Sequence, residues 1–272
     1  MIPRLSLFFV FTACLLPQAM QPDPNMPSPI AARNTLWLEE MTWLEVRDAL
    51  KSGKTTVIIP TGGVEQNGPY LAAGKHNYIL RATGEAIARK LGNALVAPIV
   101  AFVPEGEINP PTSHMRYPST ISVSEDTFQR LLTDIASSLK MHGFENIILL
   151  GDSGGNVKGM AAVSARLSKL WAKSKTRIHH IPEYYDYPSV NAWLAKQGVA
   201  QKDEGIHDDF AITAQMMVVD PTTVRMRERM AAKKFSINGV QLAPPEKTIA
   251  MGRKIVEYRA EITVAAIRKA LK

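Results

Sequence analysis

TTVIIPTGGVEQNGPYLAAGKH, residues 55–76, carries the clearest fold signal in the chain. Its first residues favour β-structure and run into a loop rich in glycine and proline, which predicts a buried strand that delivers a rigid loop at its carboxyl end. In open α/β sheets, ligands bind in the crevice at that end of the strands. Glu65, Asn67 and His76 place a carboxylate, an amide and an imidazole in this loop. Groups of these kinds bind hard or borderline divalent cations.

Segments of helical and strand character alternate after this loop. Asn77 to Leu91 is amphipathic and precedes an apolar strand at residues 94–100, and a helix from about Glu125 to His142 leads into another strand at residues 146–150. Such alternation predicts a parallel sheet with helices on both faces. The intervening residues 102–124 are rich in proline and lack periodicity, so we expect a long functional loop or lid there.

A second glycine turn, GDSGGN at residues 151–156, follows the third strand and opens another helix. It places a second polar loop at the same edge of the predicted sheet as the first. Further along, we expect a fourth strand at residues 177–181, a helix opened by residues 205–213, and a final amphipathic helix from Thr248 to Leu271.

The N-terminal segment, residues 1–20, is typical of a signal peptide. Arg4 precedes an apolar run at residues 5–16 that is too short for a permanent bilayer span. We therefore expect export to the periplasm or out of the cell. The single cysteine, Cys14, lies inside this segment, so the mature chain would lack disulfides. A lipoprotein modified at Cys14 is the alternative, which the leucines that follow disfavour.

The sequence predicts a linker and one domain for the rest of the chain. Residues 21–34, rich in proline, asparagine and serine, are expected to be a linker or N-terminal arm, and residues 35–272 a single α/β domain. Near its start, Thr42 with Glu45 three residues later predicts a capped helix. The composition, 46% hydrophobic and 21% charged with a net charge of +7, is that of a globular protein. The basic residues are scattered, and no aromatic-interleaved basic motif predicts nucleic-acid binding.

The first loop resembles the signature of the creatininase family of metal-dependent amidohydrolases, whose usual form is Glu-Gln-His-Gly-Pro-His-Leu-Pro-Leu-Gly-Thr-Asp. Six residues match in register: Glu65, Gln66, Gly68, Pro69, Leu71 and Gly74. The chain departs from the family form at its two histidines, which are Asn67 and Tyr70 here, and at its aspartate, which is His76.

Further segments carry the same resemblance. His114 begins a stretch similar to the family's His-x-x-Phe-Pro-Gly-Thr-Ile-Ser, and residues 151–156 resemble its Asn-Gly-His-Gly-Gly-Asn turn. Ser153 stands at the ligating histidine of that turn, with Asp152 beside it. His207 matches a family histidine that is proposed to pass a proton to the leaving nitrogen, a task that suits an imidazole.

The resemblance implies a three-layer α/β/α domain with a mostly parallel sheet, a homo-oligomer, and hydrolysis of a C–N bond in a small molecule such as a cyclic amide or formamide. It implies a divalent metal ion, with zinc favoured over manganese and magnesium, for which we predict the ligands Glu65, His76 and Asp152. The remaining predicted site residues are His207 and Asp209 in catalysis, and Asn67, His114, Ser153 and Asn156 in substrate binding.

Other interpretations stay open at this point. Asp152 or Ser153 could simply cap the helix that follows, and His207 with the neighbouring aspartates could form a helix N-terminus. The chain could also be an exported small-molecule-binding protein that keeps the fold without hydrolysis. A metal-free lactonase or isomerase that uses Asp152 and His207 is a further alternative.

Overall fold

The computed structural model describes residues 22–272. The chain divides into two units, Met1–Ala31 and Ala32–Lys272. The predicted signal peptide, with Cys14, lies outside the described residues. All of the elements below belong to the second unit.

The centre of this unit is a four-stranded, entirely parallel sheet. Its strands are β1 (Thr56–Thr61), β2 (Ala94–Val96), β3 (Asn146–Gly151) and β4 (Arg177–His180), in the order β2-β1-β3-β4. Every residue of β1 is buried, as expected for an apolar strand that is covered on both faces. The alternation in the sequence therefore predicted the architecture correctly, although β2 is shorter than the apolar run that suggested it.

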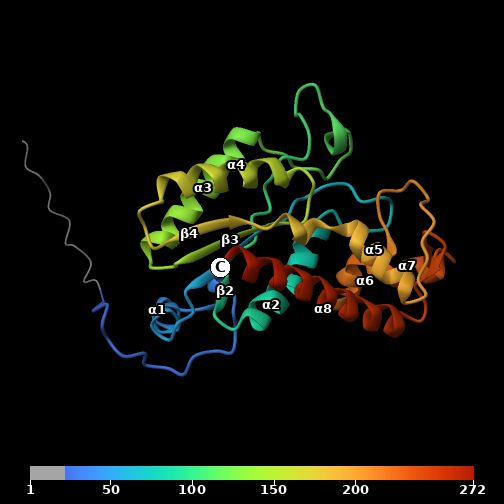
Figure 1. Cartoon of the computed structure of the whole chain (residues 1–272). Coiled ribbons are helices and arrows are strands. Elements are labelled where there is room, and N and C mark those ends of the chain that lie inside the picture. The colour runs from blue at the N-terminus through green and yellow to red at the C-terminus, as the bar shows by residue number, and fades with distance from the viewer. Residues whose placement is uncertain (1–21) are drawn as a thin grey trace, which may run out of the picture. The chain divides into compact units, whose positions relative to one another are not determined.

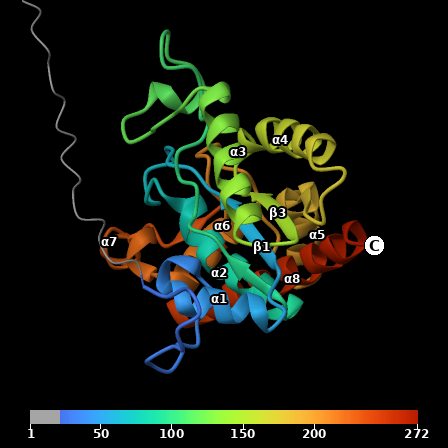
Figure 2. The ribbon, with the colours of Figure 1, turned by 90° about the vertical axis from the view of Figure 1, so that its left-hand side faces the viewer.

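Helices cover both faces of the sheet (Figures 1 and 2). On one face lie α3 (Glu125–Met141) and α4 (Asn156–Leu170), and on the other lie α2 (Lys75–Leu91) and α8 (Pro245–Ala270). The three-layer α/β/α arrangement is thus confirmed. The last of these helices begins three residues earlier than the sequence suggested, because Pro245 is well suited to a first helical turn.

Local signals in the sequence set several of the boundaries. Helix α1 (Trp43–Lys51) starts at the predicted capping box, in which the Thr42 hydroxyl accepts from the Glu45 backbone N–H and the Glu45 carboxylate accepts from the Thr42 backbone N–H. The lid at residues 102–124 is irregular apart from a 3₁₀ turn at Ser113–Arg116. Further 3₁₀ turns lie at Leu38–Glu40, Pro182–Tyr185 and Pro221–Val224.

A second hydrophobic cluster lies beside the sheet and includes elements that the sequence did not reveal. Its elements are α5 (Tyr187–Lys196), α6 (Phe210–Val219), α7 (Met226–Ala231) and the antiparallel hairpin of β5 (Ser236–Ile237) and β6 (Val240–Gln241). Helix α6 is apolar on nearly all sides and packs against α8 and α2. In the part of the chain that is described, none of the helices has the length and apolar character needed to cross a bilayer.

Candidate active site

The two predicted loops meet at the carboxyl edge of the sheet. Strands β1 and β3 are neighbours, and their last residues, Thr61 and Gly151, pair in register. The Asn156 side-chain amide donates to the Thr61 carbonyl oxygen at 3.0 Å and to that of Gly62 at 2.9 Å, which ties the start of α4 to the end of β1. A cavity of about 960 Å³ opens above this edge, between the lid, the second glycine turn and the segment before α6.

Glu65 lies at the floor of the cavity and is surrounded by cationic and imidazole groups. Its Oε1 is 3.0 Å from Lys75 Nζ and 2.9 Å from His76 Nε2, and its Oε2 is 3.1 Å from His114 Nε2. Burial by itself would raise the pKa of Glu65, but the hydrogen bond from His76 and the charge of Lys75 outweigh it and hold the pKa well below its ordinary value. Glu65 is therefore an ionised carboxylate.

His76 joins the two predicted loops. Its Nδ1 lies 2.9 Å from Asp152 Oδ2 and its Nε2 lies 2.9 Å from Glu65 Oε1. Burial lowers the pKa of His76, but the hydrogen bonds to Asp152 and Glu65 raise it by more, so the net shift is upward. An imidazolium that donates from both nitrogens has no free lone pair for a metal ion. The predicted ligands are thus brought together, but as a hydrogen-bonded chain.

Arg259 of α8 extends this series of hydrogen bonds beyond Asp152. Its Nη2 lies 2.7 Å from Asp152 Oδ1, and it also donates to the Tyr184 carbonyl oxygen at 3.1 Å and to Gln215 Oε1 at 3.0 Å. Its guanidinium lies over the rings of Tyr184 and Tyr187, 4.3 and 4.7 Å from their centroids. Burial raises the pKa of Asp152, but the charge of Arg259 outweighs it and the net shift is downward.

A second buried carboxyl group, Glu105, faces Glu65 from the lid. Burial and the negative charge of Glu65 raise the pKa of Glu105 to about 9, so this group is protonated at neutral pH. The Ser153 hydroxyl donates to Glu105 Oε2 at 3.2 Å. One carboxyl group of the pair is therefore charged and the other neutral, an arrangement that often separates a base or ligand from an acid.

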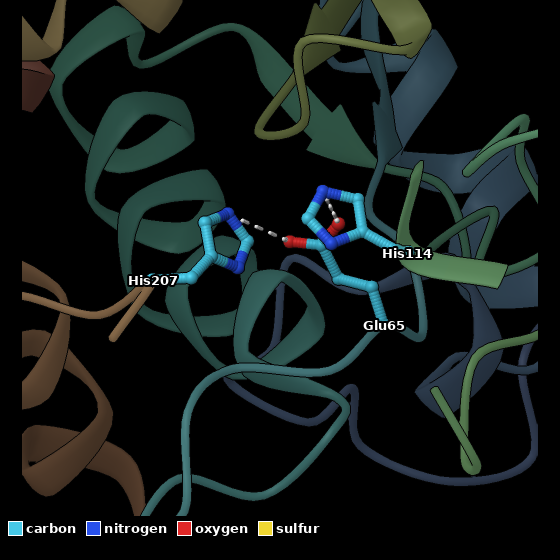
Figure 3. A group of neighbouring side chains, drawn as sticks. All are labelled: Glu65, His114 and His207. Carbon is cyan, nitrogen blue, oxygen red and sulfur yellow. Dashed lines mark ion pairs between the residues drawn. The ribbon is translucent and has the colours of Figure 1, made fainter. Parts of the chain in front are cut away.

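Two histidines, both more exposed than Glu65, flank its carboxylate (Figure 3). His114 comes from the lid and His207 from the segment before α6, with their ring centroids 4.4 Å apart. His207 Nε2 is 3.9 Å from Glu65 Oε1, while its Nδ1 lies 3.0 Å from the Gln66 carbonyl oxygen. Donation to that carbonyl directs the Nε2 lone pair at Glu65, as is usual for metal-ligating histidines. Burial and the charge of Lys75 lower the pKa of His207.

The donor atoms of Glu65, His114 and His207 fit a divalent cation. Among the described residues, they form a group whose potential ligand atoms all lie within 4.8 Å of one another. A His₂Glu set is a known catalytic zinc site, which keeps a further position open. A second such group is Glu65, His76 and Glu105. It is fully buried, and there His76 already donates from both nitrogens, so it fits a cation less well.

The structure uses three other predicted site residues to support the loops. Asn67 is buried and donates to the Glu65 and Ala72 carbonyl oxygens at 2.9 and 3.2 Å. Asn156 ties the two strand ends together, and Asp209 caps α6 by accepting from the Ile212 backbone N–H at 2.7 Å. Asp209 also lines the cavity. Roles for these residues in substrate binding or catalysis stay predictions.

Comparison with known proteins identifies the family to which this sequence belongs. The family model described as creatinine amidohydrolase matches residues 39–267, most of the chain. The chain belongs to the creatininase family. Solved creatininase structures share the fold: one has a TM-score of 0.59 at 20% identity over 88% of this chain and 97% of its own. A mutant creatininase has a TM-score of 0.61 at 19% identity over 87% and 98%. Neighbours with the same fold include a manganese form and a Zn–Zn form.

Curated relatives of this creatininase-family chain are hydrolases with different names. A mycofactocin precursor peptide peptidase of Mycolicibacterium smegmatis is 30% identical over 116 residues, which are 41% of this chain and 44% of that protein. A 3-dehydro-scyllo-inosose hydrolase of Thermotoga maritima is 27% identical over 119 residues, 44% of this chain and 36% of that protein. The matched segment thus spans less than half of the length of these relatives.

Three residues of the site were not predicted from the sequence: Lys75, Glu105 and Arg259. Lys75 adjoins His76 in the signature loop, at a position where the family form has threonine, and that departure was a usable signal. Glu105 stands in an irregular lid without a motif. Arg259 reads as one of many polar positions on an amphipathic helix, and only the tertiary structure brings it to Asp152, 107 residues away in the chain.

Proposed function

We propose that this chain is an exported, metal-dependent hydrolase that cleaves a C–N bond of a small non-peptide amide, of the cyclic amide or formamide type. One observation carries the proposal: ionised Glu65 lies between His114 and His207 on the floor of an open cavity of about 960 Å³. A cavity of this size accommodates a small molecule. Membership of a family named for an amidohydrolase supports the reaction class.

The metal-binding group that we propose is Glu65, His114 and His207. A divalent cation at such a site supplies Lewis-acid chemistry, the polarisation of a substrate carbonyl. Zinc suits one carboxylate and two imidazoles best, and manganese and magnesium are alternatives. We favour His114 and His207 over the His76 and Asp152 that the sequence suggested, because these last two already bind each other and the neighbouring charged groups.

Another part of the cavity wall provides groups that hold the amide. Glu105 and Ser153 lie side by side there, with the Ser153 hydroxyl donating to Glu105 at 3.2 Å. A neutral carboxyl group and a hydroxyl group orient an uncharged amide by hydrogen bonds without adding charge. Because both nitrogens of His207 are engaged, we assign the proton that the leaving nitrogen needs to this wall.

Export and assembly are proposals that rest on the sequence. A signal peptide at residues 1–20 would carry the chain to the periplasm or beyond, where hydrolysis needs only water as co-substrate. A homo-oligomer is the assembly that the family resemblance suggests. Fractionation of cells that produce the full chain, and the mass of the purified protein in solution, test the two points separately.

A substrate screen tests the activity. The zinc-loaded protein is incubated with creatinine, small cyclic amides and N-formyl compounds, and release of the amine or ring-opened product is measured. We expect turnover of at least one class, with loss of more than about 99% of it in Glu65→Gln, because a direct metal ligand is removed. Saturable binding without turnover by the zinc-loaded protein would instead favour a binding protein.

A further inference from the structure

A continuous series of ion pairs and hydrogen bonds extends inward from Glu65 of the metal-binding group. Lys75 Nζ lies 3.0 Å from Glu65 Oε1, and His76 then bridges Glu65 to Asp152 with two contacts of 2.9 Å. Arg259 Nη2 completes the series at 2.7 Å from Asp152 Oδ1. The inner oxygen of Glu65 and both oxygens of Asp152 thus already face groups of the protein.

The negative charges along this series are compensated without any added ion. Lys75 and Arg259 alone balance the two carboxylates, Glu65 and Asp152, and the imidazolium of His76 between them adds a further positive charge. All four side chains are withdrawn from water: those of Lys75 and Glu65 are each 3% exposed, and those of Arg259 and Asp152 are each 0% exposed. A divalent cation placed among them would lie close to the positive charges of Lys75 and Arg259. Neither carboxylate would be available to balance its charge, because both are already paired.

Neighbouring groups hold both cationic side chains, Arg259 and Lys75, in place. Arg259 is held by Gln215, by the Tyr184 carbonyl oxygen and by the rings of Tyr184 and Tyr187. Lys75 is the first residue of α2 and is 2% exposed, and its ammonium group lies at the base of the cavity, paired with Glu65 at 3.0 Å. The folded chain therefore keeps a positive charge next to each of the two carboxylates.

We propose that Lys75 and Arg259 take the place of a second metal ion, so that the site binds one divalent cation per chain, at its outer edge. The inference rests on the proposed function, which puts that cation at Glu65, His114 and His207. It sets this chain apart from the related structure described as a Zn–Zn type. The outer oxygen of Glu65 faces His114 at the open cavity, away from the arginine.

Zinc stoichiometry tests the inference directly. The full mature chain is dialysed against a series of zinc chloride concentrations, and bound zinc per chain is measured by elemental analysis. We expect one zinc ion per chain in the wild type. In Lys75→Met, which removes the ammonium beside Glu65, we expect zinc to bind at least about tenfold more tightly or a second ion to bind, since a nearby like charge is lost. Lys269→Met, which removes an exposed lysine at the end of α8, is the matched control and should behave as the wild type.

The possible outcomes separate the two proposals. Two zinc ions in the wild type, or identical binding by the wild type and a folded Lys75→Met variant, would overturn the role of Lys75 and Arg259. Zinc binding that appears only in Lys75→Met would support that role and overturn the proposed outer site. If Lys75→Met does not fold, Lys75→Arg, which keeps the charge, must still bind one ion, and the wild-type stoichiometry decides the matter without a variant.

Discussion

Arg259 Nη2 lies 2.7 Å from Asp152 Oδ1, and neither side chain has any exposure to solvent. Removal of one partner of a buried ion pair leaves the other charge uncompensated, which typically costs about 3–5 kcal/mol. We therefore expect Arg259→Met to lower the free energy of unfolding by about 3 kcal/mol or more, as measured by urea denaturation followed by circular dichroism.

A surface ion pair provides the control for this measurement. Arg130 and Asp126 face each other at 3.0 Å on α3, with side chains 78% and 72% exposed. Exposed pairs contribute little, so Arg130→Met should leave the unfolding midpoint almost unchanged. Equal effects of Arg259→Met and Arg130→Met would contradict the stabilising role of the buried pair.

Gly68 allows the segment that carries His207 to approach the signature loop. Its φ is +61°, and a Cβ atom at this position would collide with the Ile206 carbonyl oxygen. We expect Gly68→Ala to push His207 away from Glu65 and to weaken zinc binding by about tenfold or more, measured by isothermal titration calorimetry. Gly205 is a matched control, with φ +71° and no atom within 4 Å of the place that a Cβ would occupy. Gly205→Ala carries similar backbone strain but should keep wild-type affinity.

The two outer histidines should each contribute to zinc binding. His114→Ala and His207→Ala remove one proposed ligand apiece, and we expect each to weaken zinc binding by at least about tenfold, and the double variant to abolish it. Competition with a chromophoric chelator measures these affinities. His142→Ala removes an exposed histidine at the end of α3 and serves as the control. Full affinity in the double variant would show that the ion binds elsewhere.

Two histidines remote from the metal-binding group should make stability depend on pH. Burial lowers the pKa of His179 and of His180. As the pH falls through about 6.5, the unfolded chain takes up protons at these positions before the folded chain does, so the free energy of unfolding falls and then levels off below the folded pKa. His179→Gln should reduce this slope in urea titrations between about pH 8 and about pH 5. A slope identical to that of the wild type would contradict the prediction.

Much of the fold could be predicted because its signals are local. The buried strand at Thr56–Thr61 is followed by a loop of glycines, and the Thr42 capping box marks the start of α1. Helix α5 and the β5–β6 hairpin were missed because they are short. Packing of α5 against α6 and α8, and of Ile237 of the hairpin within the second hydrophobic cluster, stabilises them more than their own propensities do.

The candidate site could be predicted only in part, for a physical reason. Glu65 and Asp152 follow neighbouring parallel strands, so the sheet topology alone places them at one edge. The groups that decide how the carboxylates are used come from outside those loops. Arg259 projects from a distant helix and carries no motif signal. His114 belongs to a segment that resembles a family motif, but it comes from an otherwise irregular lid, and the sequence does not specify how that lid packs against Glu65. The sequence therefore indicates where the carboxylates lie, and tertiary packing decides what binds them.

The position of a bound zinc ion would show whether Glu65, His114 and His207 are its ligands. Crystals of the mature protein grown with zinc chloride would be measured at the zinc absorption edge to give an anomalous difference map. We predict one peak per chain, about 2.0–2.3 Å from a Glu65 carboxylate oxygen and from Nε2 of both His114 and His207. A peak between His76 and Asp152, or the absence of any peak at this edge of the sheet, would contradict the proposed metal-binding group.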